Sequence, residues 1–340
     1  MFSRAASTRI SAPELRRDPI VDRWVIISEE RGDRPIGDPR NPGSTASALC
    51  PFCPGNEAET LPEIAAVRAP NSEPDSPGWR VRTVPNKYPA LRPDAAPRDA
   101  RGPLFRRQPA AGHHEVIVEG DAHTRSVSEL QTDTMREVVG MYRDRLQSLA
   151  QINGLRSAVI IKNVGESAGA SLEHSHSQLI ATPVVPPLLA SELDANRAAS
   201  AELGKCAWCA VIREEQSQGE RVVAVGEFLV AVCPWASRFP YETWILPLAH
   251  ESHYEATSDD VLDELARFLP RIVSAIEVAL SRPPYNYVIQ SAPFPIESLD
   301  FYHWSLAVFP RVTRVAGYEQ ATGLYINPVA PESAAAKLRA

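Results

Sequence analysis

EVIVEGDAH at residues 115–123 and ETWILPLAH at residues 242–250 are two stretches of the sequence that begin with glutamate and end with Ala-His. A Cys-x-x-Cys pair precedes each stretch, and one further histidine follows each at a similar interval. Because the same residue types occur twice in the same order, we infer a duplicated domain. The first set is Cys50, Cys53, His123 and His174, and the second set is Cys206, Cys209, His250 and His303.

Each set offers two thiolates and two imidazoles, which are the ligands of tetrahedral structural zinc sites. The first Cys-x-x-Cys pair lies in a Pro/Gly-rich turn, Cys50 to Asn56, which is typical of a zinc knuckle and unlike a redox pair that opens a helix. We therefore expect two structural zinc ions per chain, with iron as an alternative in one of them. His253 is an alternative to His250 as a ligand. Four protein ligands leave no coordination position for catalytic water.

Length and composition bound the class of protein. A chain of 340 residues with 44% hydrophobic and 23% charged residues indicates a globular protein of about two domains, which we place at residues 14–186 and 200–330. A net charge of −7 gives no overall attraction to nucleic acid or to an anionic membrane. The sequence has no apolar run long enough to span a membrane and no apolar signal core at its start, so we expect a cytoplasmic protein.

Hydrophobic periodicity predicts the same order of elements in both halves. Apolar residues at helical spacing predict helices over 132–152 and 259–280. We expect each half to read strand, strand, helix, strand, strand, which is an α+β fold of duplicated histidine-triad-like domains with antiparallel sheets and helices packed on one face. The strands expected after the helices cover 157–162, 176–181, 285–289 and 304–309, and the proline-rich stretches 34–42, 70–77 and 93–109 are expected to be loops.

One histidine of the first half has no counterpart in the second half. His176 stands two residues after the expected ligand His174, whereas Ser305 stands two residues after His303. Residues i and i+2 of a strand point to the same face, so we expect His174, His176 and Gln178 to be neighbours. An uncharged imidazole is a good nucleophile at neutral pH, which makes His176 the candidate catalytic nucleophile. Gln178 could donate hydrogen bonds to a phosphoryl oxygen.

A loop of small residues precedes His174, and its backbone N–H groups could cradle phosphates. These small residues are Gly165, Ser167, Gly169 and Ser171. The remaining histidines are expected on the surface or in loops. They are His113, His114 and, apart from its alternative role as a ligand, His253.

The motif His-x-His-x-Gln after an Asn-x-Gly loop, with Cys-x-x-Cys near position 50, resembles the galactose-1-phosphate uridylyltransferase family of the histidine triad superfamily. The likeness extends over almost the whole chain, from Asp18-Pro19 to Gly317-Tyr318-Glu319. It implies a double-displacement nucleotidyltransferase without a redox cofactor. His176 would attack the α-phosphorus of a nucleoside-diphosphate sugar, hold the nucleotide covalently and pass it to a sugar 1-phosphate.

The resemblance also implies roles for further residues. Arg31 and Arg34 would contact phosphates, and Asn86 would lie near the nucleoside. Family members are homodimers whose sites borrow residues from the partner, so Gly317 and Tyr318 would act from the other chain. The residues that would surround the phosphoryl groups are Asn163, Gly169, Ser171 and Gln178.

The sequence departs from the family pattern at two points. Ser175 stands between the two histidines, where the family's uridylyltransferases usually have proline, and Cys206 and Cys209 replace a metal site made of a glutamate and several histidines. Both departures are similar to the branch that includes plant ADP-glucose phosphorylase. The expected activity is that of a UDP-glucose–hexose-1-phosphate (galactose-1-phosphate) uridylyltransferase. The alternatives are ADP-glucose phosphorylase and a nucleotide-binding zinc protein without turnover.

Overall fold

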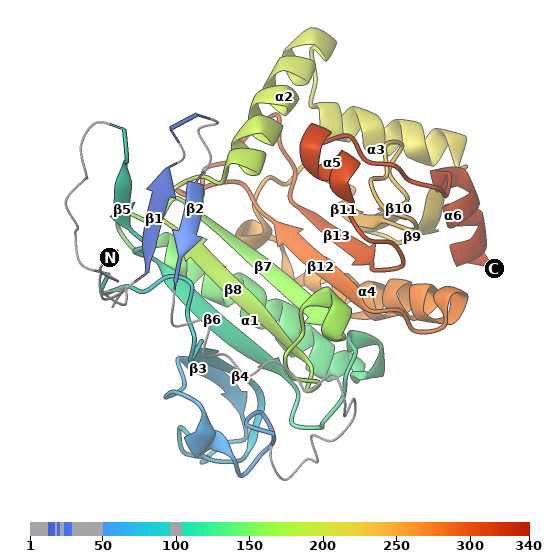
Figure 1. The fold of residues 1–340 in the computed structure, drawn as a ribbon. Coiled ribbons are helices and arrows are strands. Elements are labelled where there is room, and N and C mark those ends of the chain that lie inside the picture. Colours follow the sequence, from blue (N-terminus) through green and yellow to red (C-terminus); the bar gives the residue numbers. More distant parts are fainter. Residues whose placement is uncertain (1–12, 18, 21–23, 29–49, 96–103) are drawn as a thin grey trace, which may run out of the picture.

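A ten-stranded antiparallel sheet forms the centre of the described chain (Figure 1). The structure is a computed structural model, and it describes residues 13–17, 19–20, 24–28, 50–95 and 104–340. The strand order is β3-β4-β6-β8-β7-β12-β13-β11-β10-β9. The strands are β3 (Ala65–Arg68), β4 (Trp79–Pro85), β6 (His113–Glu119), β7 (Ser157–Val164), β8 (His176–Thr182), β9 (Val222–Val225), β10 (Leu229–Val232), β11 (Thr243–Pro247), β12 (Tyr285–Gln290) and β13 (Ser305–Pro310).

The order of the strands is symmetric about the middle of the sheet. Counted from the two edges inward, β3 corresponds to β9, β4 to β10, β6 to β11, β8 to β13 and β7 to β12. The halves join where β7 pairs with β12, from Val164 opposite Tyr285 to Val159 opposite Gln290. A duplicated unit would give this arrangement. Because a single sheet runs through both halves, the division into domains at 14–186 and 200–330 stays a prediction.

The two long helices are α1 (Thr132–Ala150) and α4 (Asp259–Leu280). The predicted α+β fold with antiparallel strands is confirmed. The predicted order within each half is wrong in one respect, because three strands of the ten-stranded sheet, rather than two, precede each helix. The additional strands, β3 and β9, are short edge strands of four residues, and so few residues give no clear alternation in the sequence.

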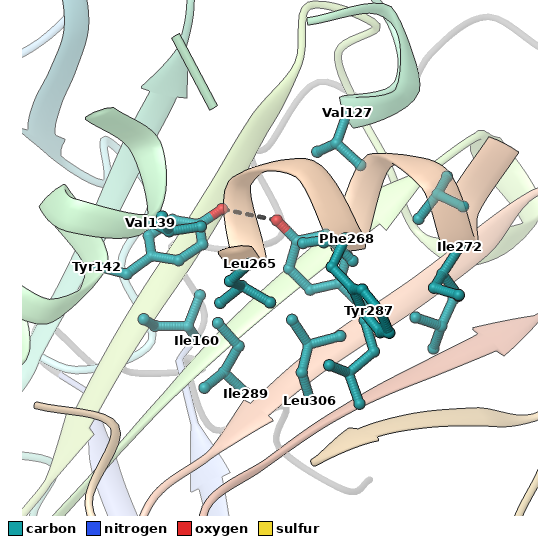
Figure 2. Close-up of a cluster of buried hydrophobic side chains, with 14 of the residues drawn as sticks. Val127, Val139, Tyr142, Ile160, Leu265, Phe268, Ile272, Tyr287, Ile289 and Leu306 are labelled. Carbon is teal, nitrogen blue, oxygen red and sulfur yellow. Dashed lines mark hydrogen bonds between the residues drawn. The ribbon is translucent and has the colours of Figure 1, made fainter. Parts of the chain in front are cut away.

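Both long helices contribute to one hydrophobic core on one face of the sheet (Figure 2). Each fully buried aliphatic or aromatic side chain there stabilises the fold by about 1.5–3 kcal/mol. Ile117 of β6 and Leu229 of β10 point into this core. Their neighbours Val116 and Val230 point to the opposite face, where they pack in separate clusters with Cys50 and with Cys206. Strand alternation therefore places both cysteine pairs on the face away from α1 and α4.

A second, three-stranded sheet has the order β2-β1-β5. Its strand β5 lies inside the proline-rich stretch 93–109, so the prediction of a loop is wrong for residues 107–109, where an edge position tolerates Pro109. The stretch 34–42 lies outside the described residues. Within the described part of the chain, no helix is long and apolar enough to cross a bilayer. The remaining elements are β1 (Glu14–Arg17), β2 (Trp24–Ile27), β5 (Arg107–Pro109), α2 (Pro187–Leu203), α3 (Ala207–Gln218), α5 (Gly317–Thr322), α6 (Pro331–Arg339) and the short 3-10 turns η3 (Glu57–Glu59), η4 (Val127–Glu129), η5 (Glu166–Ala168) and η6 (Tyr254–Ala256).

Candidate active site and metal centres

The first Cys-His set comes together from three segments of the chain. Cys50 and Cys53 lie in a turn, His123 follows β6, and His174 precedes β8, and their ligand atoms all lie within 4.8 Å of one another. The Sγ atom of Cys53 is 3.2 Å from Nδ1 of His123 and 3.5 Å from Nδ1 of His174. The Nε2–H group of His174 donates to the carbonyl oxygen of Gly120 at 2.9 Å, which leaves its Nδ1 lone pair facing the cysteines.

The second set has the same composition and a different local structure. Its four ligand atoms also lie within 4.8 Å of one another. Cys206 is the N-cap of α3 and Cys209 lies in its first turn, so this pair, unlike the first, does open a helix. The Sγ atom of Cys209 is 3.5 Å from Nδ1 of His250 and 3.2 Å from Nε2 of His303.

The alternative ligand His253 lies outside the second set. Its ring nitrogens are within hydrogen-bond distance of the Ser252 hydroxyl, at 2.9 Å, and of the Pro293 carbonyl oxygen, at 3.2 Å. His253 is also buried, in the loop just before η6, so it holds the expected loop position but is not on the surface. His250 is the residue whose Nδ1 faces Cys209, because its Nε2–H donates to the carbonyl oxygen of Leu299.

Both sets fit a tetrahedral cation. With zinc–sulfur and zinc–nitrogen bonds of about 2.3 and 2.1 Å, neighbouring sulfur and nitrogen ligands are about 3.6 Å apart, and the Cys–His distances range from 3.2 to 3.8 Å. Burial raises the pKa of the Cys50 thiol to about 11 and lowers the pKa of His174 to about 4 and of His303 to about 3. The rings of His174 and His303 are therefore neutral, as ligands must be, and the Cys50 thiol needs a cation beside it to become a thiolate.

A cavity of about 560 Å³ lies beside the first set, and Phe52, Asn86, His176 and Gln178 are among the residues that line it. Burial lowers the pKa of His176 to about 4, so its ring is neutral at physiological pH. The Nδ1–H group of His176 donates to the carbonyl oxygen of His174 at 2.7 Å. The lone pair of the neutral ring is therefore on Nε2, which is the arrangement of a ring nitrogen that can act as a nucleophile.

We expected His174, His176 and Gln178 to lie in one row on the same strand, and the position of His174 differs from this expectation. Strand β8 begins at His176, so His174 lies before the strand rather than in it. His176 and Gln178 do share the face that lines the cavity. His174 reaches His176 through its backbone carbonyl, and the connection between the Cys-His set and the candidate nucleophile is this hydrogen bond.

His114 is a further residue of the site, and the expectation that it lies on the surface is wrong. It is buried on β6, and its Nδ1 accepts a hydrogen bond from the backbone N–H of Ala90 at 3.0 Å. The proton of the neutral ring is therefore on Nε2, which donates to Oε1 of Gln178 at 2.9 Å. Asn86, whose Oδ1 accepts from the N–H of Tyr88, places its Nδ2 3.1 Å from Nε2 of His114 and 3.5 Å from Oε1 of Gln178, to which it can donate.

These contacts determine which way the Gln178 amide faces. Two donors, the ring Nε2–H of His114 and the amide of Asn86, meet at one atom of Gln178, and only the amide oxygen can accept from both. The NH₂ group of Gln178 therefore faces the cavity. It is placed to donate hydrogen bonds to an anionic ligand near His176.

The loop of small residues contributes less to the cavity than expected. The N–H groups of Ala168, Gly169 and Ala170 bond to carbonyl oxygens of the loop itself, so these three are not offered to a phosphate. Ser171 lines the cavity. Asn163 accepts a hydrogen bond from Asn286 at 2.7 Å and, like Gly169, is not among the lining residues.

Other predicted site residues lie elsewhere. Gly317 and Tyr318 begin α5, do not line the cavity of their own chain, and the Tyr318 side chain is exposed. Arg31 and Arg34 lie outside the described residues. His113 is on β6, half-buried, rather than in a loop.

Comparison with known proteins finds relatives along the whole chain. The family described as galactose-1-phosphate uridyl transferase, N-terminal domain, matches residues 4–186. An ADP-glucose phosphorylase of Arabidopsis thaliana is 36% identical over 98% of this chain and 94% of the relative. A galactose-1-phosphate uridylyltransferase of Thermotoga maritima is 31% identical over 96% of this chain and 98% of the relative.

Solved structures show the same fold. The crystal structure of the Arabidopsis thaliana ADP-glucose phosphorylase with bound ADP-glucose superposes with a TM-score of 0.75 at 34% identity, covering 96% of this chain and 99% of that one. A uridylyltransferase structure superposes with a TM-score of 0.79 at 25% identity, covering 96% and 97%. The similarity therefore includes both halves of the sheet and is not restricted to the residues around the cavity.

Proposed function

This chain belongs to the galactose-1-phosphate uridylyltransferase family and is a nucleotidyltransferase, and from that premise we propose that it transfers a nucleotidyl group from a nucleoside-diphosphate sugar through a covalent bond to His176. The observation that carries the proposal is the state of the His176 ring. The ring is neutral, its Nδ1–H is held by the His174 carbonyl, and it lines the cavity.

In the proposed first step, Nε2 of His176 attacks the α-phosphorus of the nucleotide sugar. A phosphorus–nitrogen bond forms as the bond from phosphorus to the sugar-phosphate oxygen breaks, and sugar 1-phosphate leaves. The ring gains positive charge in this step. The His174 carbonyl oxygen, 2.7 Å from Nδ1, stabilises that charge through the hydrogen bond it already accepts.

In the proposed second step, a phosphate oxygen of the acceptor attacks the same phosphorus, and the bond to His176 breaks. Both steps build negative charge on the non-bridging oxygens of the transferred group. The NH₂ group of Gln178, oriented by His114 and Asn86, donates to one of these oxygens. Ser171 is the member of the small-residue loop that reaches the phosphoryl groups from the cavity wall.

Both Cys-His sets are proposed as structural zinc sites, one held by Cys50, Cys53, His123 and His174 and the other by Cys206, Cys209, His250 and His303. When bound, each ion would cross-link the segments that carry its four ligands and neutralise the charge of the two thiolates. With four protein ligands, an ion would have no position left for an activated water. The first set also fixes His174, whose carbonyl orients His176.

Two pairs of substrates, each a nucleotide-sugar donor with its phosphate acceptor, fit this chemistry. The greater identity to the Arabidopsis thaliana ADP-glucose phosphorylase, together with the superposition on its ADP-glucose complex, supports ADP-glucose as the donor and inorganic phosphate as the acceptor. UDP-glucose with galactose 1-phosphate is the second candidate, supported by the Thermotoga maritima uridylyltransferase. We also retain the homodimer in the proposal, because the exposed Tyr318 lies outside its own cavity and is available to a partner's.

The test is to incubate the protein with nucleotide-labelled ADP-glucose and, separately, with nucleotide-labelled UDP-glucose. We expect label on the protein that is released by acid and retained in alkali, as for a phosphoramidate, with the better donor labelling faster. His176→Gly serves as the control and should take up no label. Absence of label with both donors would contradict the covalent mechanism and favour a protein that only binds nucleotides.

A further inference from the structure

A fully buried ion pair lies on the helix side of the sheet, behind the cavity. Lys162 of β7 and Glu119 of β6 are 1% and 0% exposed, and their side chains form a salt bridge. Lys162 occupies a row of otherwise apolar positions, in which Ile160 and Val164 contribute to the main core. Removing two charges from water costs several kcal/mol per ion, and the attraction between them often only offsets that cost. Stability alone is therefore a weak explanation for this pair.

Every hydrogen of the Lys162 ammonium has an acceptor. Besides the carboxylate of Glu119, Nζ donates to the hydroxyl oxygen of Ser175 at 2.8 Å and to the carbonyl oxygen of His176 at 3.2 Å. The Ser175 hydroxyl in turn donates to Oε2 of Glu119 at 2.8 Å. The ion pair thus holds the side chain of one residue and the backbone of the next.

The carboxylate also binds the following residue of the strand. Oε1 of Glu119 accepts hydrogen bonds from the hydroxyls of Ser177 and Tyr142, and Tyr142 is linked to Tyr287 at 2.6 Å (Figure 2). Helix α1 supplies Tyr142 and strand β12 supplies Tyr287, so the network is fixed from both sides. It is a closed set of hydrogen bonds within the core.

Alternation along β8 connects this network to the cavity. Ser175 and Ser177 point toward the ion pair, while His176 and Gln178, the residues between and after them, point into the cavity. Ser175 lies just before the first residue of β8, where its backbone N–H donates to the carbonyl oxygen of Thr124 at 2.7 Å and its carbonyl oxygen accepts from the N–H of Glu119 at 3.0 Å, so the ion pair adds side-chain contacts to a backbone that is already paired. Ser175 is also the residue that stands in place of the expected proline.

We propose that Lys162, held by Glu119, is a positioning residue that fixes the backbone of residues 175–176 and so aims Nε2 of His176 at the substrate phosphorus. This inference rests on the proposed nucleophilic role of His176. Hydrogen bonds from the buried Lys162 ammonium restrain the backbone of residues 175–176, as the ring of a proline at position 175 would restrain it covalently. Because neither charge lines the cavity, the pair acts on the geometry of the transfer step and leaves substrate binding unchanged.

The test compares three proteins with the wild type: Ser175→Ala, the double variant Lys162→Met with Glu119→Gln, and Tyr285→Phe. Ser175→Ala removes one small hydroxyl, and the double variant removes both charges together, so neither leaves an uncompensated buried ion. Tyr285→Phe is the matched control, because it removes a fully buried hydroxyl, bonded to Ser126 at 3.0 Å, that does not reach β8. Rapid-quench measurement of covalent nucleotidyl-protein, with ADP-glucose and with UDP-glucose, gives the rate of the first step.

We expect Ser175→Ala and the double variant to slow formation of the covalent intermediate about 10–100-fold, with KM and zinc content close to those of the wild type. Tyr285→Phe should keep the wild-type rate even where its melting temperature falls as much as that of Ser175→Ala. The inference is overturned if Ser175→Ala and the double variant react at the wild-type rate, or if the rates of all three variants fall in proportion to their melting temperatures. A wild-type protein that forms no covalent intermediate would instead overturn the proposed function.

Discussion

At His176, one hydrogen bond decides which ring nitrogen can react. The His174 carbonyl can only accept, so Nδ1 carries the proton and Nε2 carries the lone pair. At His114 the reverse holds, because the backbone N–H of Ala90 can only donate, and Nε2 becomes the donor to Gln178. Backbone groups thus fix two tautomers, and these determine a nucleophile and the orientation of an amide.

Replacing His176 by alanine removes the nucleophile without touching a metal ligand. We expect the turnover rate to fall by about 10⁴-fold or more, while the zinc content stays that of the wild type. Steady-state kinetics and metal analysis of the same preparation measure both. An equal loss of zinc and activity would show that His176 belongs to the metal site instead.

Replacing His114 by phenylalanine keeps a ring and removes the donor to Gln178. The Gln178 amide can then turn its oxygen toward the cavity, so we expect kcat to fall about 10–100-fold with a small change in KM. His113→Phe is the matched control, because the neighbouring position on β6 points to the other face of the sheet. Equal kcat values for the two variants would show that Gln178 is oriented by other contacts.

The residues of the site were predictable from the sequence to different degrees. The Cys and His residues are few and repeat in the same order, and the structure brings both sets of four together. His114 was missed, although a signal existed. It shares the even-numbered face of β6 with Val116, a residue that lines the cavity, and strand alternation would have placed both on that side.

At the scale of elements, the segment between β7 and β8 determines how His176 is presented. The segment begins with Gly165 at φ 85°, where a Cβ atom would lie 2.9 Å from Cβ of Pro284, just before β12. Both the backbone conformation and the close approach require glycine. The long helices and the strands after them could be predicted because their periodicity is local, whereas this contact joins residues far apart in the sequence.

Gly165→Ala should destabilise the protein by about 1–3 kcal/mol and lower the transfer rate, because the loop that leads to Ser171 and His176 must shift. Gly154→Ala provides the comparison. Its φ is 90° and no atom lies within 4 Å of the added Cβ, so it carries the backbone strain without the collision. Denaturant unfolding and single-turnover rates distinguish the two. If Gly154→Ala lowers the free energy of unfolding and the transfer rate as much as Gly165→Ala does, the contact with Pro284 has no special role.

At the scale of the whole molecule, the two halves form one sheet and not two separate ones. The pairing of β7 with β12 joins the two halves into this sheet, and the sequence could not predict it, because no local pattern specifies which edge strands of two repeats meet. Of the two Cys-His sets, only the first connects to His176, through the hydrogen bond from its ring to His174. The duplication therefore gives two similar scaffolds and one candidate reaction site.

Metal analysis tests this asymmetry. We expect two zinc ions per wild-type chain, and one ion in either Cys53→Ser or Cys209→Ser, while Cys233→Ala, which changes a buried cysteine outside both sets, keeps two. Each closed site contributes about 10–16 kcal/mol of apparent binding energy to folding, so chelation should lower the melting temperature strongly. Cys53→Ser should also reduce the transfer rate of the remaining folded protein more than Cys209→Ser does. If either serine variant still carries two zinc ions, the Cys-His set that contains the changed residue is not a zinc site.

The most direct measurement is to trap the covalent intermediate with nucleotide sugar in the absence of acceptor, digest it in alkali and locate the nucleotide by mass spectrometry. The account predicts a single modified peptide that carries the nucleotide on His176, and it predicts that adding acceptor removes the modification at the rate of turnover. A nucleotide found on another residue, or a wild-type protein that turns over substrate without ever carrying one, would contradict it.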